Sequence, residues 1–135
     1  MRLHTTKIVV RTGLWIGLMF GAPYGATAQS DECTELKRDI SEMKADIAQY
    51  EKDTELDPAD IPELMQEVAA LRADLKDYLS DRTSDRQERQ KAREGLAMVD
   101  AMERGIQQKN LKEVLTQYAK IITLYEWFED YEDCP

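Results

Sequence analysis

Apolar residues recur at alternating spacings of three and four positions along most of the chain beyond residue 30, which is the spacing of one face of an α-helix. The first run forms a heptad seam and predicts a helix from about Asp31 to Asp53, with Ser30 as its N-cap. The residues of this seam are Cys33, Leu36, Ile40, Met43, Ile47 and Tyr50.

A second apolar run predicts a helix that ends near Ser80. Pro62 lacks the backbone N–H that a position deep in a helix needs, so we expect the helix to begin at an Asp60 cap, with Glu63 closing a capping box. The apolar positions of this helix are Ile61, Leu64, Val68, Leu71, Leu75 and Tyr78, widened by Met65, Ala69 and Leu79.

The segment from Asp81 to Arg93 is polar except for Ala92, and the sequence leaves open whether it is helix or loop. A third helix with a cap at Thr83 or Ser84 is compatible with this segment. Its apolar face comes later and consists of Leu96, Val99 and Met102.

Gly105 is expected to end the third helix in a left-handed conformation, because glycine adopts it without steric cost. Asn110 and Glu113 then form a second capping box, which predicts a last helix to about Tyr131. The apolar face of this helix is the widest, and it consists of Leu111, Val114, Leu115, Tyr118, Ile121, Ile122, Tyr125 and Phe128.

The four helices predict an all-α fold, an up-down-up-down four-helix bundle of paired helical hairpins with coiled-coil-like packing. Cys33 and Cys134 stand at opposite ends of this helical region, and with four helices those ends meet at one end of the bundle. We therefore expect one intramolecular disulfide and a monomer, in preference to a disulfide-linked dimer.

Residues 1–28 are typical of a cleaved secretory signal peptide, with a basic start, an apolar stretch from Leu14 to Ala22 and small residues up to Ala28. Residues 29–135 are then a single helical domain in the periplasm or outside the cell. No membrane association is expected after cleavage, since the apolar stretch is too short to favour a retained anchor.

Charge and composition exclude several classes of partner and of catalytic site. The chain has a formal net charge of −9, and loss of the three basic residues of the leader makes it −12, which disfavours nucleic acid as a partner. The only histidine, His4, lies in the leader. Without it, histidine-based nucleophilic catalysis and histidine-ligated metals are excluded, so we expect no enzyme activity, cofactor or metal.

The aromatic end of the last helix is the best candidate binding site in the sequence. Large rings there are expected to lie beside the end of the second helix, where they either fill the core or leave an apolar groove. The candidate residues are Leu75, Tyr78, Leu79, Tyr125, Trp127, Phe128 and Tyr131.

A charge contrast marks the same end. The segment from residue 81 to 93 is basic overall, whereas residues 126–133 are acidic. We expect the two to neutralise each other; the alternative is a basic docking strip for an acidic partner.

The sequence therefore predicts an exported non-catalytic helical protein, acting as a protein-interaction or cell-envelope accessory module. The alternative is a carrier of a small apolar ligand with a cavity beside Tyr78 and Phe128. An interaction module is expected to expose an apolar stripe around Ile40 and Ile47, and catalysis would need an inward-facing pair of carboxylates with raised pKa values.

Overall fold

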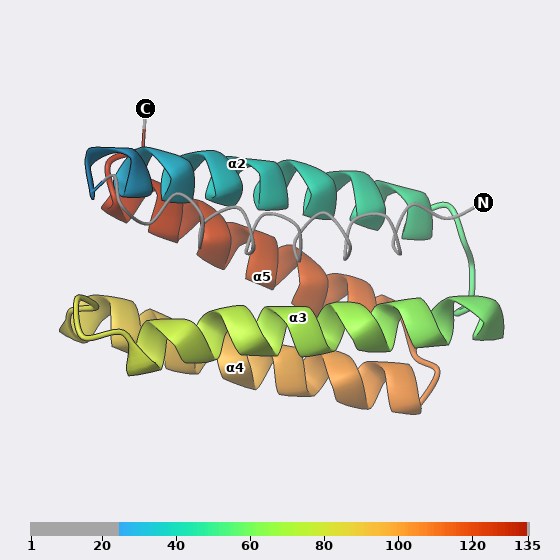
Figure 1. The fold of residues 1–135 in the computed structure, drawn as a ribbon. Coiled ribbons are helices and arrows are strands. Elements are labelled where there is room, and N and C mark those ends of the chain that lie inside the picture. The colour runs from blue at the N-terminus through green and yellow to red at the C-terminus, as the bar shows by residue number, and fades with distance from the viewer. Residues whose placement is uncertain (1–24, 135) are drawn as a thin grey trace.

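The computed structural model describes residues 25–134 of the chain. Within them, successive helices run in opposite directions, which confirms the predicted up-down-up-down four-helix bundle (Figure 1). The elements are α2 (Gly25–Tyr50), the short 3-10 helix η1 (Pro58–Asp60), α3 (Ile61–Ser80), α4 (Arg86–Gln107) and α5 (Leu111–Tyr131). Most of the predicted signal peptide lies outside the described residues.

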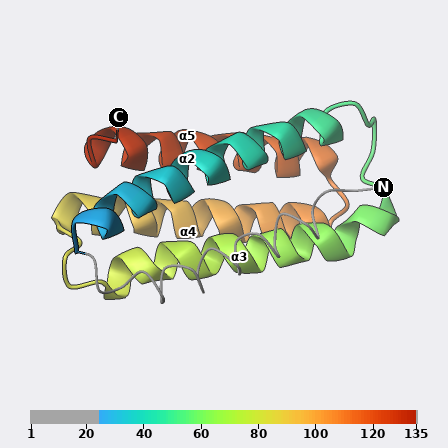
Figure 2. The ribbon, with the colours of Figure 1, turned by 45° about the horizontal axis from the view of Figure 1, so that its top comes forward.

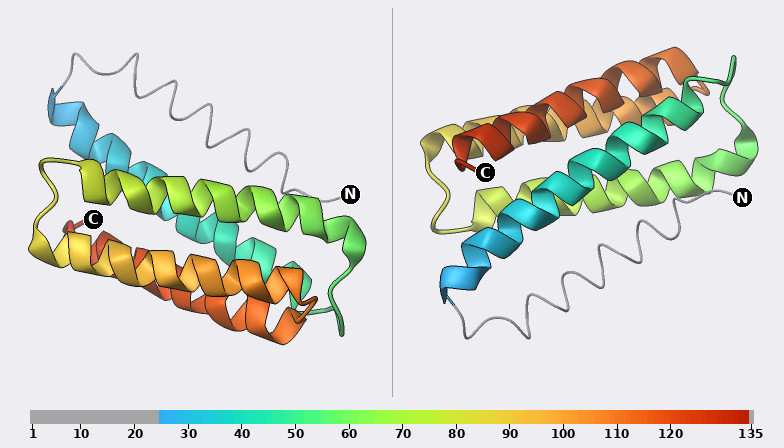
Figure 3. Two further views of the ribbon diagram at one scale, coloured as in Figure 1. Left: turned by 90° about the horizontal axis from the view of Figure 1, so that it is seen from below. Right: turned by 90° about the horizontal axis from the view of Figure 1, so that it is seen from above.

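The helices form two layers, with α2 and α5 in one and α3 and α4 in the other (Figures 1 and 2). Helix α4 also packs against α5 and so joins the layers. By contrast, no Cα atom of α2 comes within 8 Å of one in α3, and α2 is inclined across the bundle (Figure 3). Around the bundle, the helices therefore pack in the order α3, α4, α5, α2. The edge between α2 and α3 is left open.

The apolar seams identified in the sequence face the interior. Met43, Leu71 and Phe128 are fully buried, and most other members of the four runs are buried. On α2, Ile40 is buried and Ile47 packs partly buried against the core. The expectation of an exposed apolar stripe around these two isoleucines is wrong, because the bundle itself uses that face.

The predicted helix starts need three corrections. Helix α2 begins at Gly25, so Ser30 lies inside it and is not its cap. At α3, Asp60 occupies the N-cap position but makes no capping hydrogen bond, while Asp57 caps η1 by accepting a hydrogen bond from the Ala59 N–H at 3.0 Å. The predicted box with Glu63 is therefore absent.

The third correction concerns α4, which begins at Arg86. Residues 86–93 are helical and the four before Asp85 form a turn, which answers the question that the sequence left open. Asp85, and neither Thr83 nor Ser84, is the N-cap. It accepts a hydrogen bond from the Glu88 N–H at 2.9 Å, and the Glu88 carboxylate accepts one from the Asp85 N–H at 3.1 Å.

The turn between α4 and α5 also differs from expectation. The left-handed residue is Lys109, at φ 56°, and Gly105 remains helical. The Asn110 N–H donates to the Gly105 carbonyl at 2.8 Å and the Lys109 N–H to the Ile106 carbonyl at 3.1 Å, which is a Schellman motif. Asn110 caps α5 as predicted, but its own N–H is used in this motif, so the reciprocal half of the capping box is absent.

Both buried glycines of α4 lie at close approaches between helices. A Cβ on Gly105 would lie 3.1 Å from Val114 Cγ2 of α5, and one on Gly95 would lie 2.9 Å from Leu75 Cδ1 of α3. Close packing, and not left-handed backbone, is thus the reason for glycine at Gly105. Among the described residues, no helix is both long and apolar enough to span a membrane.

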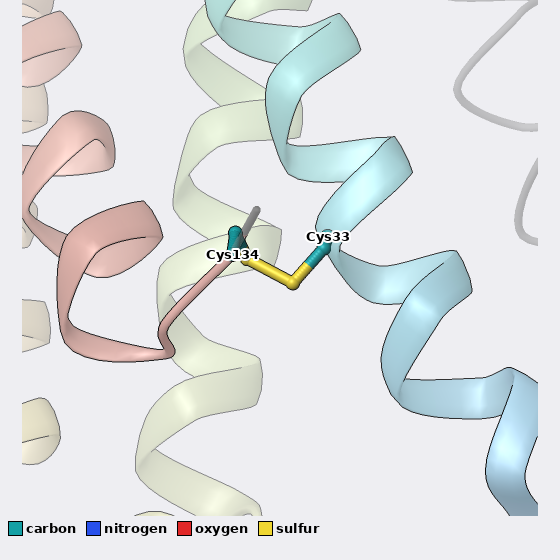
Figure 4. The surroundings of a disulfide bond; sticks show 2 residues. All are labelled: Cys33 and Cys134. Carbon is teal, nitrogen blue, oxygen red and sulfur yellow. A yellow bond between two sulfur atoms is a disulfide. The ribbon is translucent and has the colours of Figure 1, made fainter.

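The predicted disulfide is present. Cys33 near the start of α2 and Cys134 just after α5 are joined with a Cα–Cα distance of 5.4 Å, across a sequence separation of 101 residues (Figure 4). The bridge fastens α2 to α5 at the end of the bundle that also carries the aromatic residues.

Candidate functional site

The predicted aromatic site is divided by the structure into two parts. Phe128 is fully buried, with its ring stacked on Tyr78 at a centroid distance of 4.1 Å and met edge-on by Tyr125 at 6.5 Å. Leu75 and Leu79 belong to the same core. These rings fill the interior at this end, which leaves the space around Phe128 occupied by protein.

Trp127 borders this core and meets the Phe128 ring edge-on at a centroid distance of 5.3 Å, and Tyr131 lies beyond it. Their rings stack at 4.6 Å, and the Tyr131 side chain is 38% exposed. The Tyr131 hydroxyl donates a short hydrogen bond to the Asp85 carboxylate, which ties the end of α5 to the start of α4. Trp127 faces the basic first turns of α4, and Lys91 Nζ lies 5.4 Å from the centroid of its ring.

A groove of about 440 Å³ opens between α2 and α3 beside the aromatic core. Its apolar surface comes from Leu36, Tyr78 and Tyr125. Eight of its fourteen lining residues are acidic and none is basic. These acidic residues, which define the acidic groove, are Glu32, Glu35, Asp39, Asp74, Asp77, Asp81, Glu88 and Glu132.

The acidic groove has a regular origin in the sequence. On both α2 and α3 an acidic residue directly precedes successive members of the apolar seam, so the acids follow the same alternating spacing and lie on one flank of each helix. On α2 they are Glu32, Glu35, Asp39, Glu42 and Asp46; in or just before α3 they are Asp60, Glu63, Glu67, Asp74 and Asp77.

Antiparallel packing brings these two flanks together. Consider two neighbouring antiparallel helices whose apolar seams both face the interior. On each helix, the flank formed by the residues that directly precede the seam then faces the other helix. The carboxylates of α2 and α3 therefore face a common edge. Their mutual repulsion and need for hydration are consistent with the wide backbone separation between α2 and α3.

Some of these carboxylates are buried and contact tyrosine hydroxyls. The Tyr118 hydroxyl lies 3.4 Å from a carboxylate oxygen of Asp46 and also 3.4 Å from one of Glu67, where its single proton serves one acceptor at a time. Tyr125 donates to Asp74 at 3.3 Å. These contacts from α5 hold the acidic flanks of α2 and α3 in place.

The electrostatics of the groove reflect crowded negative charge. Burial raises the pKa of Glu132 to about 7, helped by the nearby carboxylates of Glu88, Glu32 and Asp81. Burial and the carboxylates of Asp81 and Glu88 also raise the pKa of Glu32. Burial, followed by the same acidic surroundings, raises the pKa of Tyr78 well above its ordinary range, so this hydroxyl stays protonated.

The sequence analysis raised two chemical questions for these carboxylates, namely metal binding and a catalytic pair with raised pKa values. Within residues 25–134, no group of three or more acidic, cysteine or histidine side chains is placed to hold a metal ion. Among the described carboxylates, the pKa values of Glu32 and Glu132 are raised, and both residues line the groove.

The expected neutralisation of the basic segment by the acidic tail is not found. In the described part of the chain, no ion pair joins residues 81–93 to residues 126–133. Glu126 instead pairs with Lys44 at 2.8 Å, and Lys91 lies 3.7 Å from Glu94 on its own helix. Arg89 of α4 donates a hydrogen bond to the Asp81 carbonyl at 3.2 Å, and Lys91 lies over the ring of Trp127.

The sequence analysis found Tyr78 and Tyr125 but missed the carboxylates that dominate the groove. The sequence does contain a signal for these carboxylates, because on both α2 and α3 an acidic residue directly precedes most residues of the apolar seam. Comparison of the chain with protein-family models, curated proteins and solved structures gave no match.

Proposed function

We propose that this protein is an exported, non-catalytic interaction module that binds a cationic helical segment of a partner protein in the acidic groove. The observation that carries the proposal is the acidic lining of the groove between α2 and α3, over an apolar floor. A helix with basic residues beside an apolar face matches both features, in the manner of other helix-in-groove complexes.

The charge of the whole molecule supports the same partner class. A net charge of −9 attracts cationic segments from a distance, and a concave acidic surface concentrates that attraction. The Cys33–Cys134 disulfide supports export, since such bridges persist in oxidising compartments. Against the alternative of an apolar-ligand carrier stand the filled aromatic core and the eight carboxylates around the groove.

The proposal is tested with a synthetic amphipathic peptide of Lys and Leu as the probe, titrated against the protein by isothermal calorimetry. The groove variant Glu32→Gln/Asp77→Asn removes two exposed charges that take part in no capping or ion-pair contact described above. We expect it to weaken binding about tenfold, a loss of roughly 1.4 kcal/mol.

The matched control is Glu51→Gln/Asp53→Asn, which makes the same charge change in the exposed turn at the opposite end. It should leave the affinity within about twofold. Equal weakening by the two variants would show that the peptide senses only net charge, and absence of binding at millimolar peptide would reject the proposal.

A further inference from the structure

The carboxylates along the acidic groove repeat at a short and regular spacing. Three of them on α2 lie three and then four positions apart, and three in α3 and at its C-cap repeat that order. At a rise of about 1.5 Å per residue, neighbours in a row lie about 4.5 to 6 Å apart along the helix, and each row spans about 10 Å. The two rows are Glu32, Glu35 and Asp39, and Asp74, Asp77 and Asp81.

A linear aliphatic polyamine carries positive charge at the same repeat. Ammonium groups joined by three or four methylenes lie about 5 to 6 Å apart in an extended chain, given covalent bonds of about 1.5 Å. Spermidine has one arm of each length, so its three ammonium groups span about 11 Å. Aliphatic amines keep their protons near pH 7, as lysine does, so all three are cations when they meet the carboxylates.

The floor and the size of the groove suit the methylenes of such a chain. Leu36, Tyr78 and Tyr125 supply apolar surface, and the faces of tyrosine rings also attract ammonium groups. The volume of about 440 Å³ falls within the range of roughly 300 to 1,000 Å³ that is typical of small-molecule sites. None of the fourteen lining residues is basic, so the lining itself supplies no cation that would compete with the ligand.

A buried hydroxyl in the groove points to a ligand independently of the carboxylates. Ser84 lines the groove and is only 6% exposed. Within the described part of the chain its hydroxyl has no hydrogen-bond partner, whereas buried polar groups ordinarily have one. An ammonium group in the groove can donate a hydrogen bond to this oxygen.

We propose that the acidic groove binds a linear aliphatic polyamine of the length of spermidine, with its ammonium groups against the carboxylate rows and its methylenes on the apolar floor. The bound cation offsets the crowded negative charge that helps to raise the pKa of Glu132 to about 7. The inference rests on the groove of the proposed function and adds a small ligand that competes for it, because an occupied groove cannot receive a cationic helix.

The spacing of the charges is tested by isothermal calorimetry at 0.15 M salt, where the Debye length is about 8 Å and general attraction to an acidic protein is screened. Spermidine should bind the wild type one to one with a Kd below about 0.1 mM. The comparison ligand is bis(hexamethylene)triamine, which carries the same three amines but spaces them about 9 Å apart. It should bind about tenfold more weakly in spite of its longer apolar arms.

The role of the buried hydroxyl is tested with Ser84→Ala, which should weaken spermidine binding about tenfold, the effect of losing one hydrogen bond to a charged group. The matched control is Ser80→Ala. Ser80 also lines the groove, but its hydroxyl already lies 3.2 Å from the Lys76 carbonyl and 3.3 Å from the Asp77 carbonyl. This control should bind spermidine like the wild type.

The exposed-charge variants provide a second test that does not alter a buried residue. Glu32→Gln/Asp77→Asn removes one charge from each row and should also weaken spermidine binding about tenfold. Glu51→Gln/Asp53→Asn, at the opposite end of the bundle, should leave it unchanged.

Equal affinity for the two triamines, absence of binding at about 1 mM spermidine, or equal losses in each variant and its control would overturn the polyamine proposal. The two proposals fail separately. A protein that binds the Lys/Leu peptide but not spermidine retains the proposed function, whereas one that binds spermidine but not the peptide retains only the small-ligand site.

Discussion

At the scale of single residues, the notable feature is the use of carboxylates as flank residues beside an apolar seam. Asp39 and Glu67 are almost completely buried although each sits on an open edge of the bundle. Burial of charge is costly unless polar groups compensate it, and the tyrosine hydroxyls of α5 supply part of that compensation. Tyr118 and Tyr125 are thus both core residues and the inner wall of the acidic edge.

Glu132 makes the stability of the fold depend on pH. Its folded-state pKa of about 7 lies above the ordinary glutamate value of 4.5, so the folded protein binds a proton more tightly than the unfolded chain. The resulting stabilisation is complete below pH 4.5 and is lost as pH rises through 7. Thermal melts should therefore give a higher Tm at pH 5 than at pH 8, and Glu132→Gln should reduce that difference.

The control for this experiment is Glu129→Gln on the same turn, which should keep the wild-type pH profile. A profile that is unchanged by Glu132→Gln would contradict the assignment. The same protonation removes negative charge from the groove, so binding of the Lys/Leu peptide should weaken from pH 8 to pH 5 while the fold becomes more stable.

At the scale of elements, the helix ends carry most of the differences between expectation and structure. The sequence offers several adjacent cap residues before α4, and the cap that forms is Asp85, with Glu88 three residues later closing the box. The hydroxyl of Tyr131 then reaches the same carboxylate from α5, and its hydrogen bond lowers the pKa of Asp85. A local cap is thereby joined to the tertiary structure.

Asp85→Ala should lower the urea concentration at the unfolding midpoint, because an N-cap and the anchor of Tyr131 are lost together. Asp85→Asn retains an acceptor for the Glu88 N–H and should recover most of that loss. If the alanine variant unfolds at the wild-type urea midpoint, the cap contributes nothing to stability.

At the scale of the whole molecule, the open edge between α2 and α3 determines both stability and function. Helix α2 packs its backbone closely on α5 alone among the helices, so it is the least supported of the four. The disulfide compensates by tying its first turns to the end of α5. The groove can therefore stay open and hydrated without release of α2.

Cys134→Ser should consequently destabilise the fold by about 4 to 5 kcal/mol, the chain-entropy value for a closed loop of this length. That corresponds to a fall in Tm of roughly 15 to 25 °C by calorimetry. Cys33→Ser/Cys134→Ser should melt like the single variant, which separates loss of the bridge from effects of a free thiol. An unchanged midpoint would mean that the bridge does not constrain the unfolded chain.

The sequence by itself determined the number of helices and their buried faces, and it predicted the pairing of Cys33 with Cys134. The periodicity that marks a buried helix face is a local property of the sequence. An even number of antiparallel helices also returns the chain to the end at which it began, which places both cysteines at that end. Only the tertiary structure decided which flanks of neighbouring helices face one another. The acids before Leu36 and Tyr78 became a groove because α2 packs on α5 and stays apart from α3, whereas Trp127 and Tyr131 were turned toward α4. A single helix fixes which side is buried, but the neighbour of each remaining side depends on how all four helices pack.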